Sequence, residues 1–526
     1  HLGSIFLTCP GARHVEADPP RHGRRITSHR HFRHHCTAAF LIVSSASHPN
    51  SSPVVVWFRQ DLRLADNPAL NAAAATGAPL LAVYVLDDET PGDWAMGGAS
   101  RWWLHKSLTA LGKDLEGLGV PLVLLSGKAD QRIADLVKES GASAVFWNRC
   151  YEPFARKRDA ALKEALKSDG VEAHSFNGSL LAEPWTVSTK DGGPYRVFTP
   201  YYRALEAMQD DVSPLSAPDR LGGFRGDLRG EKLDDWKLLP TAPDWAEGFE
   251  EVWTPGERGA LARLERFMDG HVTAYADTRN LPATPGTSGL SPHLHFGEIS
   301  PRQVWARVMA DAPAGKGRET FCKEIGWREF SYHLLYHYET LPEANYQPKF
   351  DHFPWADSEA AFKAWTRGRT GYPIVDAGMR ELWHTGWMHN RVRMICASFL
   401  TKHLLIDWRK GEQWFWDTLV DADLASNSAS WQWVAGSGAD AAPYFRIFNP
   451  VSQGEKFDAK GEYVRRWVPE LKDLPDKLIH APWTATQAEL ARAGITLGTT
   501  YPEPVIDHSR ARERALAAFA TLKGAA

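Results

Sequence analysis

Cysteine is scarce in this chain of 526 residues, and its five copies are widely scattered. Cys9, Cys36, Cys150, Cys322 and Cys396 form no C-x-x-C pair. A sparse, odd set of cysteines builds neither a disulfide framework nor a zinc ribbon. The pattern therefore excludes a disulfide-stapled secreted domain and indicates a reducing compartment.

Long apolar runs and nucleotide-binding signatures are also missing. A membrane-spanning helix needs about 20 apolar residues, and the best candidate, Phe40–Ala46, is far too short. No G-x-G-x-x-G follows the first apolar run, and no P-loop occurs. GSGADA (Gly436–Ala441) resembles a dinucleotide motif but belongs to no strand–helix–strand unit. We therefore expect no membrane span, no obvious NAD or ATP site, and no bound metal.

Charge of one sign does not dominate either, since the formal net charge is −4. The hydrophobic share of 43% and the charged share of 24% are those of a globular protein, and the length favours two or three domains. A nucleic-acid partner would need a local basic patch. Tryptophan, with 22 copies, is the unusual abundance.

Residues 1–52 differ from the rest, with six arginines, no lysine and only Glu16 and Asp18 as acids. HRHFRHHC (His29–Cys36) looks like a metal cluster, but no spacing there is diagnostic. We interpret the segment as a disordered basic leader. We expect a cytoplasmic, bacterial-type protein. An organellar transit peptide has a similar composition, so organellar targeting stays open.

Short apolar runs then alternate with helix-like stretches. The runs are Val54–Phe58, Pro79–Leu86, Pro121–Leu125, Ser143–Trp147 and Val171–Phe176, and the stretches between them are Asn67–Thr76, Ala99–Leu118, Ala129–Ser140 and Phe154–Ser168. This alternation predicts an α/β domain over residues 53–182, with a doubly wound parallel sheet. Ligands of such sheets bind at the carboxyl ends of the strands, where Arg59–Asn67 and Asn148–Pro153 would lie.

The remaining chain divides into two further segments. Residues 183–255 are rich in proline and glycine and are predicted to be a long linker. Residues 256–526 show helical patterning without convincing strand alternation, which predicts an all-helical domain.

Four motifs in the second half combine residues that a simple core would not need. In the first, Thr287, Ser288, Gly289, Leu290 and Ser291 offer hydroxyls and backbone N–H groups that suit a phosphate, although an ordinary capped turn is the alternative. Just beyond them, Ser300 is predicted to cap a helix that Pro301 opens.

The other three motifs place polar and aromatic side chains at helical spacing. Glu324, Trp327, Arg328 and Ser331 would share one helix face. Asn390 and Met394 stand four residues apart and would present an amide and a thioether together, beside Arg391 and Arg393. The segment LVDADLASNSASWQWVAGS contains the other set: Asp421, which could pair with Arg393, then Asp423, Asn427, Trp431 and Trp433.

In this order and at these separations, the motifs resemble the photolyase/cryptochrome flavoprotein family. The resemblance runs from about Val54 to Trp483 and is most specific in TSGLSP, GWREF, GYPIVDAGMRELWHTGWMHNRVRM and DADLASNSASWQWVAGSGADAAPYFRIFNP. It implies an N-terminal α/β domain, a linker and a helical domain that binds FAD, active in its reduced form. The cofactor-binding residues implied are Tyr275, Thr287, Ser288, Gly289, Leu290, Ser291, Arg328, Trp387, Asn390, Arg393, Asp421, Asp423 and Asn427.

The resemblance also implies a reaction. Asn427 would stand by flavin N5, where plant-type cryptochromes carry an aspartate, and this favours a repair enzyme. Asn390 and Met394 occupy the places of two histidines in (6–4) photolyases, and they resemble the cyclobutane pyrimidine dimer enzymes. With Glu324 and Asn427 they form the expected catalytic set. The expected reaction is light-driven electron transfer from reduced FAD to a dimer flipped out of DNA.

Further residue roles follow from the same resemblance. Lesion or backbone contacts are implied for Arg279, Glu324, Trp327, Asn390, Arg391, Trp433, Arg446 and Gln453. Trp431, Trp408 and Trp355 match the electron-transfer chain between flavin and surface. Glu152 resembles an antenna contact, which implies a methenyltetrahydrofolate antenna, with a deazaflavin as the alternative.

We expect a monomer whose partner is DNA containing pyrimidine dimers. Three alternatives to a dimer-repairing enzyme stay open at this point: a cryptochrome-like photoreceptor, a (6–4) photolyase, and a helical nucleic-acid-binding module without flavin.

Overall fold

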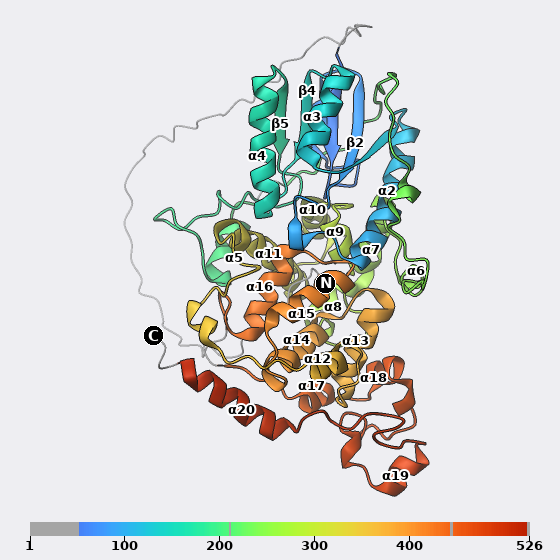
Figure 1. Cartoon of the computed structure of the whole chain (residues 1–526), viewed down its shortest axis with the longest axis vertical. Helices are drawn as coiled ribbons and strands as arrows, with labels where there is room; N and C mark the ends of the chain where they lie inside the picture. Colours follow the sequence, from blue (N-terminus) through green and yellow to red (C-terminus); the bar gives the residue numbers. More distant parts are fainter. Residues whose placement is uncertain (1–51, 210–211, 442–444, 523–526) are drawn as a thin grey trace, which may run out of the picture.

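The computed structural model describes residues 52–209, 212–441 and 445–522. The predicted basic leader, including His29–Cys36, lies outside these residues except for Ser52. In Figure 1 an α/β domain stands above a helical domain, and α2 (Gly98–Gly117) runs down toward the junction between them.

A five-stranded parallel sheet forms the first domain, as the alternating pattern predicted. Its strands are β1 (Val54–Phe58), β2 (Leu80–Leu86), β3 (Leu122–Ser126), β4 (Ala144–Asn148) and β5 (Glu172–Phe176), in the order β3-β2-β1-β4-β5. Successive side chains of β1 point to opposite faces. Val54, Val56 and Phe58 pack with α1 (Pro68–Ala75) and α2, whereas Val55 and Trp57 pack with α3 (Ala129–Ser140) and α4 (Pro153–Ser168).

The predicted linker carries short helices and packs against the helical domain. It contains α5 (Phe198–Glu206), a 3-10 turn at Leu233–Trp236, and α6 (Phe249–Val252). Phe198 of α5 stacks on Trp327 with ring centroids 3.4 Å apart. This segment therefore contributes to the site below, and the limits 53–182, 183–255 and 256–526 stay predictions.

The remainder is helical, and no strand is assigned between Glu257 and Leu522 in the described part of the chain. Its helices are α7 (Glu257–Arg266), α8 (Val272–Thr278), α9 (Ser291–His295), α10 (Pro301–Asp311), α11 (Lys316–His337), α12 (Glu359–Thr366), α13 (Pro373–Thr385), α14 (Asn390–Ser398), α15 (Trp408–Thr418), α16 (Leu424–Ala435), α17 (Pro450–Phe457), α18 (Glu462–Trp467), α19 (Gln487–Arg492) and α20 (His508–Thr521). The predicted start of α10 is confirmed, because the Ser300 hydroxyl accepts a hydrogen bond from the Gln303 backbone N–H at 2.9 Å. Among the described residues, no helix is both long and apolar enough to cross a membrane.

A buried carboxylate joins the two domains. Glu298 accepts hydrogen bonds from the Trp103 indole of α2 at 3.0 Å and from the Gly256 backbone N–H at 2.7 Å. Its second oxygen lies 2.5 Å from Nδ1 of His293, and neither of these two side chains is exposed. Because three polar groups from different segments converge on one carboxylate, the junction is fixed in position rather than loosely packed.

We predict that Glu298→Ala destabilises the protein by about 3 kcal/mol, since it leaves buried donors without an acceptor. The measurement is the urea dependence of unfolding, followed by tryptophan fluorescence. Glu250→Ala is the matched control, because Glu250 pairs with Lys106 at the surface and such pairs contribute at most about 1 kcal/mol. Equal unfolding midpoints for the two variants would contradict the role given to Glu298.

Candidate active site

Helix α16 packs against both α11 and α14, and this packing brings the sequence motifs together. Every residue of α16 is buried, including the polar residues Ser426, Asn427 and Gln432. A helix buried on all sides with polar side chains needs partners or a ligand around it. The contacts of these side chains define the candidate site.

Asp423 caps the N-terminus of α16 and is held as a carboxylate. Its side chain accepts a hydrogen bond from the Ser426 backbone N–H at 2.7 Å and another from the Tyr332 hydroxyl, and His295 Nδ1 lies 3.7 Å away. Burial alone would raise the pKa of Asp423, but the nearby His295, the Arg328 charge and the Tyr332 hydrogen bond hold it below its ordinary value. Tyr332 and His295 were not predicted from the sequence, although Tyr332 follows Arg328 by one helical turn.

Arg393 and Asp421 form the ion pair that the sequence suggested. Arg393 Nη2 donates to Asp421 Oδ2 at 2.8 Å, and its Nε donates to the Met388 carbonyl at 2.7 Å. The other oxygen of Asp421 is buried and has no hydrogen-bond partner in the described structure. One half of this carboxylate is therefore available to a ligand.

Asn427 is oriented by a residue that the sequence analysis did not single out. Its amide nitrogen donates to the Glu412 carbonyl of α15 at 3.0 Å, and the Glu412 carboxyl lies 2.5 Å from the Ser428 hydroxyl. Burial raises the pKa of Glu412 well above its ordinary value. One N–H of the Asn427 amide is thus engaged, and the amide oxygen can act as an acceptor.

The predicted phosphate-binding turn lies beside this cluster. Gly289 has a φ of +63°, a left-handed backbone conformation that favours glycine. The Ser291 hydroxyl accepts a weak hydrogen bond from the Trp387 indole at 3.4 Å. Tyr275 is fully buried, and its hydroxyl has no partner among the described residues.

Two adjoining cavities are lined by these residues, and their lining groups can be compared with those that a flavin nucleotide requires. The first is lined by Arg393, Phe415, Leu419, Asp421, Ala422, Ser426, Asn427 and Ser430, and the second by Ser291, Leu294, His295, Arg328, Asp421, Asp423 and Ser426. They share Asp421 and Ser426, and one oxygen of Asp421 is buried without a partner among the described residues. Hydroxyls and a glycine turn on one side, with an amide and an ion pair on the other, are the kinds of group that the two halves of FAD would need.

The predicted substrate residues of α11 lie within one helical turn of Arg328, which lines the second cavity. Glu324 is ion-paired with Arg279, and both side chains are buried. Burial raises the pKa of Glu324, and the Arg279 charge offsets part of that rise. Trp327, one turn further along α11, has one ring face covered by Phe198.

Trp433 and Asn390 approach from α16 and α14. The Trp433 indole donates to the Asp440 carbonyl at 3.1 Å, and the Asp440 carboxylate accepts from the Phe198 backbone N–H at 3.2 Å. Phe198 and Asp440 thus link the two predicted lesion-flanking indoles. The Asn390 amide oxygen is buried without a partner in the described chain, and Met394 lies one turn along the same helix.

Three arginines gather around this region. Arg279 follows α8, Arg391 lies in the first turn of α14, and Arg446 precedes α17. The charges of Arg279 and Arg446 both act on Arg391, and together with burial they lower its pKa to about 10. Gln453 of α17 is half-buried. The local basic patch that a nucleic-acid partner requires is therefore present in a chain of mildly negative net charge.

The predicted electron-transfer tryptophans occupy different environments. Trp431 and Trp408 are fully buried, and Trp355 is partly exposed. The Trp408 indole donates to Asn345 Oδ1 at 3.0 Å, whereas the ring neighbours of Trp431 are Phe415 at 5.0 Å and Trp365 at 6.2 Å. The path through Trp431, Trp408 and Trp355 stays a prediction.

Glu152 lies at the carboxyl ends of the strands, as predicted. Gln60 donates to its Oε1 at 2.9 Å, while its Oε2 is buried without a partner among the described residues. The cavity here has a volume of about 120 Å³ and also contacts Arg59, Cys150 and Arg158.

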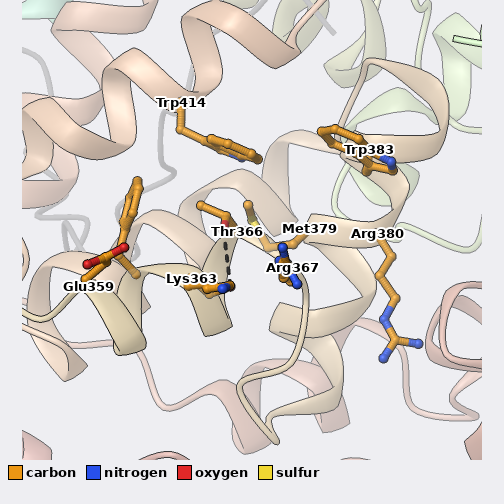
Figure 2. A pocket seen from close by; sticks show the side chains of 9 residues that line it. Glu359, Lys363, Thr366, Arg367, Met379, Arg380, Trp383 and Trp414 are labelled. Atoms are coloured by element: carbon orange, nitrogen blue, oxygen red, sulfur yellow. Dashed lines mark hydrogen bonds between the residues drawn. The ribbon is translucent and has the colours of Figure 1, made fainter. Parts of the chain in front are cut away.

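A larger cavity, of about 690 Å³, lies on the helical domain between α12, α13 and α15 (Figure 2). The indoles of Trp383 and Trp414 are nearly parallel there, with an interplanar angle of 13° and ring centroids 6.3 Å apart. The exposed cations Lys363 and Arg367 stand at its rim. The volume lies within the range of small-molecule sites, and no motif in the sequence indicated it.

Comparison with known proteins agrees with this geometry. Residues 54–219 match the DNA photolyase family profile, and residues 321–521 match the FAD binding domain of DNA photolyase. The chain is 56% identical to a deoxyribodipyrimidine photo-lyase of Agrobacterium fabrum over 90% of this chain and 98% of that protein. It is 41% identical to cryptochrome-1 of Arabidopsis thaliana over 88% of this chain and 69% of that protein. The crystal structure of a bacterial class III photolyase from Agrobacterium tumefaciens superposes with a TM-score of 0.88 at 56% identity, covering 92% of this chain and all of the other.

The chain therefore belongs to the DNA photolyase family of FAD-binding proteins. Within that family, its higher identity to the Agrobacterium enzyme than to the plant cryptochrome assigns it to the deoxyribodipyrimidine photo-lyase class of enzymes.

We predict that Asp421→Ala strips the protein of most of its flavin. The change leaves the Arg393 guanidinium buried without its carboxylate, at a cost of about 3–5 kcal/mol. The ratio of flavin to protein absorbance after gel filtration measures the loss. Asp417→Ala is the matched control, because Asp417 of α15 accepts a hydrogen bond from the exposed Gly98 N–H, away from the cavities. Full flavin content in Asp421→Ala would show that the ion pair does not support the cofactor.

Proposed function

We propose that this enzyme repairs cyclobutane pyrimidine dimers in DNA by a light-driven reaction at the cavities of α11, α14 and α16. The observation that carries the proposal is the buried set of Arg393, Asp421 and Asn427, whose ion pair and amide suit a flavin, next to helix α11, which packs against α16 and carries Glu324. When bound, reduced FAD would supply the electron that splits the dimer after absorbing blue light. As part of the proposal, the chain acts as a monomer on DNA in the cytoplasm, in line with its scarce cysteines.

The chain's own residues have distinct roles in this proposal. Arg393 supplies positive charge near a reduced, anionic flavin, and Asp421 fixes the guanidinium in place. The Asn427 amide would hydrogen-bond the ring edge of a bound flavin, and as a neutral amide it could not protonate the ring. Ser288, Gly289 and Ser291 hold the pyrophosphate with hydroxyl and backbone groups.

The same helices carry the residues that would contact the substrate. Burial raises the pKa of Glu324, and its carboxyl group, paired with Arg279, would form a hydrogen bond with the thymine edge and stabilise charge there. Trp327 and Trp433 offer flat apolar surfaces to a dimer that has left the base stack. Asn390 and Met394 offer an amide and a thioether and lack the acid–base capacity that a (6–4) photoproduct requires.

We predict that the flavin-reduced protein removes dimers from DNA under blue light and that Glu324→Ala slows this repair about tenfold or more. The reason is the loss of one charge-assisted hydrogen bond to the substrate. Dimer content after graded illumination is the measurement, with bound flavin quantified in parallel. Glu339→Ala is the matched control, since Glu339 is an exposed partner of Arg156 and Lys157.

Two outcomes would count against the assignment. If the unaltered protein leaves dimers intact under illumination, the cryptochrome-like photoreceptor becomes the preferred function. If Glu324→Ala repairs at the parental rate with flavin retained, the enzyme assignment survives but the role of Glu324 is wrong.

An antenna chromophore is the second part of the proposal. We place it in the cavity of Figure 2, because about 690 Å³ admits a folate whereas about 120 Å³ beside Glu152 does not without rearrangement. Trp383 and Trp414 would stack on a flat ring, and Lys363 and Arg367 would face an anionic tail. Trp414 directly precedes Phe415, which lines the flavin cavity, so the antenna would lie one helix away from the flavin. This chemistry favours methenyltetrahydrofolate over a deazaflavin.

We predict that Trp383→Ala loses the near-ultraviolet antenna band while keeping the flavin band, because one stacking surface of the cavity is removed. Absorption spectra of the purified variants are the measurement. Glu152→Ala is the paired variant and is expected to keep both bands. The opposite pattern would move the antenna to the Glu152 cavity, and a blue-absorbing band in the parent would identify a deazaflavin.

A further inference from the structure

The Arg391 guanidinium is buried and is held in a fixed orientation by two neighbouring side chains. Its side chain is largely buried, and its guanidinium lies over the Phe457 ring of α17 at 4.4 Å. Nε and Nη2 both donate to the same acceptor, the Asn280 amide oxygen, at 3.2 and 2.8 Å. Asn280 and Phe457 therefore fix both the plane and the rotation of the guanidinium.

The charge of Arg391 is not neutralised by this arrangement. No salt bridge to Arg391 exists within residues 52–209, 212–441 and 445–522, whereas the neighbouring Arg279 is paired with Glu324. Arg279 and Arg446 add positive charge around it. A buried cation among like charges favours an incoming anion.

The choice of an amide as the holding group has a chemical consequence. A carboxylate at position 280 would orient the guanidinium but also cancel its charge, whereas an amide oxygen orients it and leaves the charge intact. Two of the five guanidinium N–H groups are used by Asn280, so three stay available to another acceptor. That number suffices for bidentate binding of a phosphate.

We propose that Asn280 is a positioning residue that presents the Arg391 guanidinium to a DNA backbone phosphate beside the lesion. The inference rests on the proposed DNA-repair function and deepens it. Asn280 does not touch the DNA or the flavin in this arrangement. It acts through Arg391 and makes the phosphate contact less costly, because the side chain is already ordered before the DNA arrives.

The experiment is a double-mutant cycle on the flavin-loaded protein, kept in the dark so that no repair occurs. The affinity for a fluorescein-labelled oligonucleotide with one thymine dimer is measured by anisotropy for the parent, Asn280→Ala, Arg391→Ala and the double variant. Asn280→Ala is expected to weaken DNA binding about tenfold, because the Arg391 guanidinium loses the amide oxygen that accepts its hydrogen bonds. In the Arg391→Ala background the same change is expected to alter binding by less than about twofold, because its target is gone.

Controls separate positioning from general damage to the fold. Flavin absorbance reports folding, and Asn71→Ala, in α1 of the α/β domain, is the matched asparagine variant, expected to bind as the parent does. Asn280→Ser provides a second variant in case alanine impairs folding, since a serine hydroxyl is too short to reach the guanidinium. The repair rate at saturating DNA is expected to stay at the parental value in both position-280 variants, because only binding depends on Asn280.

Three results would overturn the proposal. Parental affinity in Asn280→Ala with flavin retained would show that Asn280 does no positioning. An undiminished cost of Asn280→Ala in the Arg391→Ala background would show that it acts through another group. Parental affinity in Arg391→Ala would remove the phosphate contact itself, while dimer loss under illumination would still support the repair function.

Discussion

The complete burial of α16 is the constraint on which the site depends. Its polar side chains cannot reach water, so their partners must come from neighbouring helices or from a ligand. The Ser428 hydroxyl hydrogen-bonds one oxygen of the Glu412 carboxyl, and the Glu412 backbone carbonyl orients Asn427. Asp421 keeps one oxygen without a partner at the cavity wall. The groups left over after internal pairing are those that a flavin can engage.

The pKa values of the two buried acidic side chains Asp423 and Glu324 shift in different directions, depending on their neighbours. Asp423 is held ionised by His295 and Arg328, while burial pushes Glu324 toward its protonated form. The cofactor side thus combines fixed charge with neutral amides, and the substrate side carries a buried carboxyl group that is paired with Arg279. Asn280 is a neutral holding group, because it orients the Arg391 guanidinium without adding charge. Such an arrangement leaves the positive charges of the arginines available to anionic partners.

Much of the architecture was predictable because its signals are local. Alternating apolar runs marked all five strands, and the Ser300–Pro301 pair marked the start of α10. The Arg393–Asp421 pair was also foreseen, since a buried arginine needs a carboxylate. Tyr332, His295, Glu412 and Asn280 were missed. Each of these residues contacts a partner far away in the sequence, or belongs to a common residue type whose role depends on the side chains packed against it.

By itself, the sequence determined which elements form and which residue types the family chemistry needs, because strand periodicity, caps and motif spacing are properties of short segments. Only the tertiary structure decided which atoms face the cavities. It placed Phe198, from a proline-rich linker, on Trp327, and it set Trp383 parallel to Trp414 around a cavity that no motif indicates. These relations arise from packing between distant segments, and packing direction is not encoded in any local pattern.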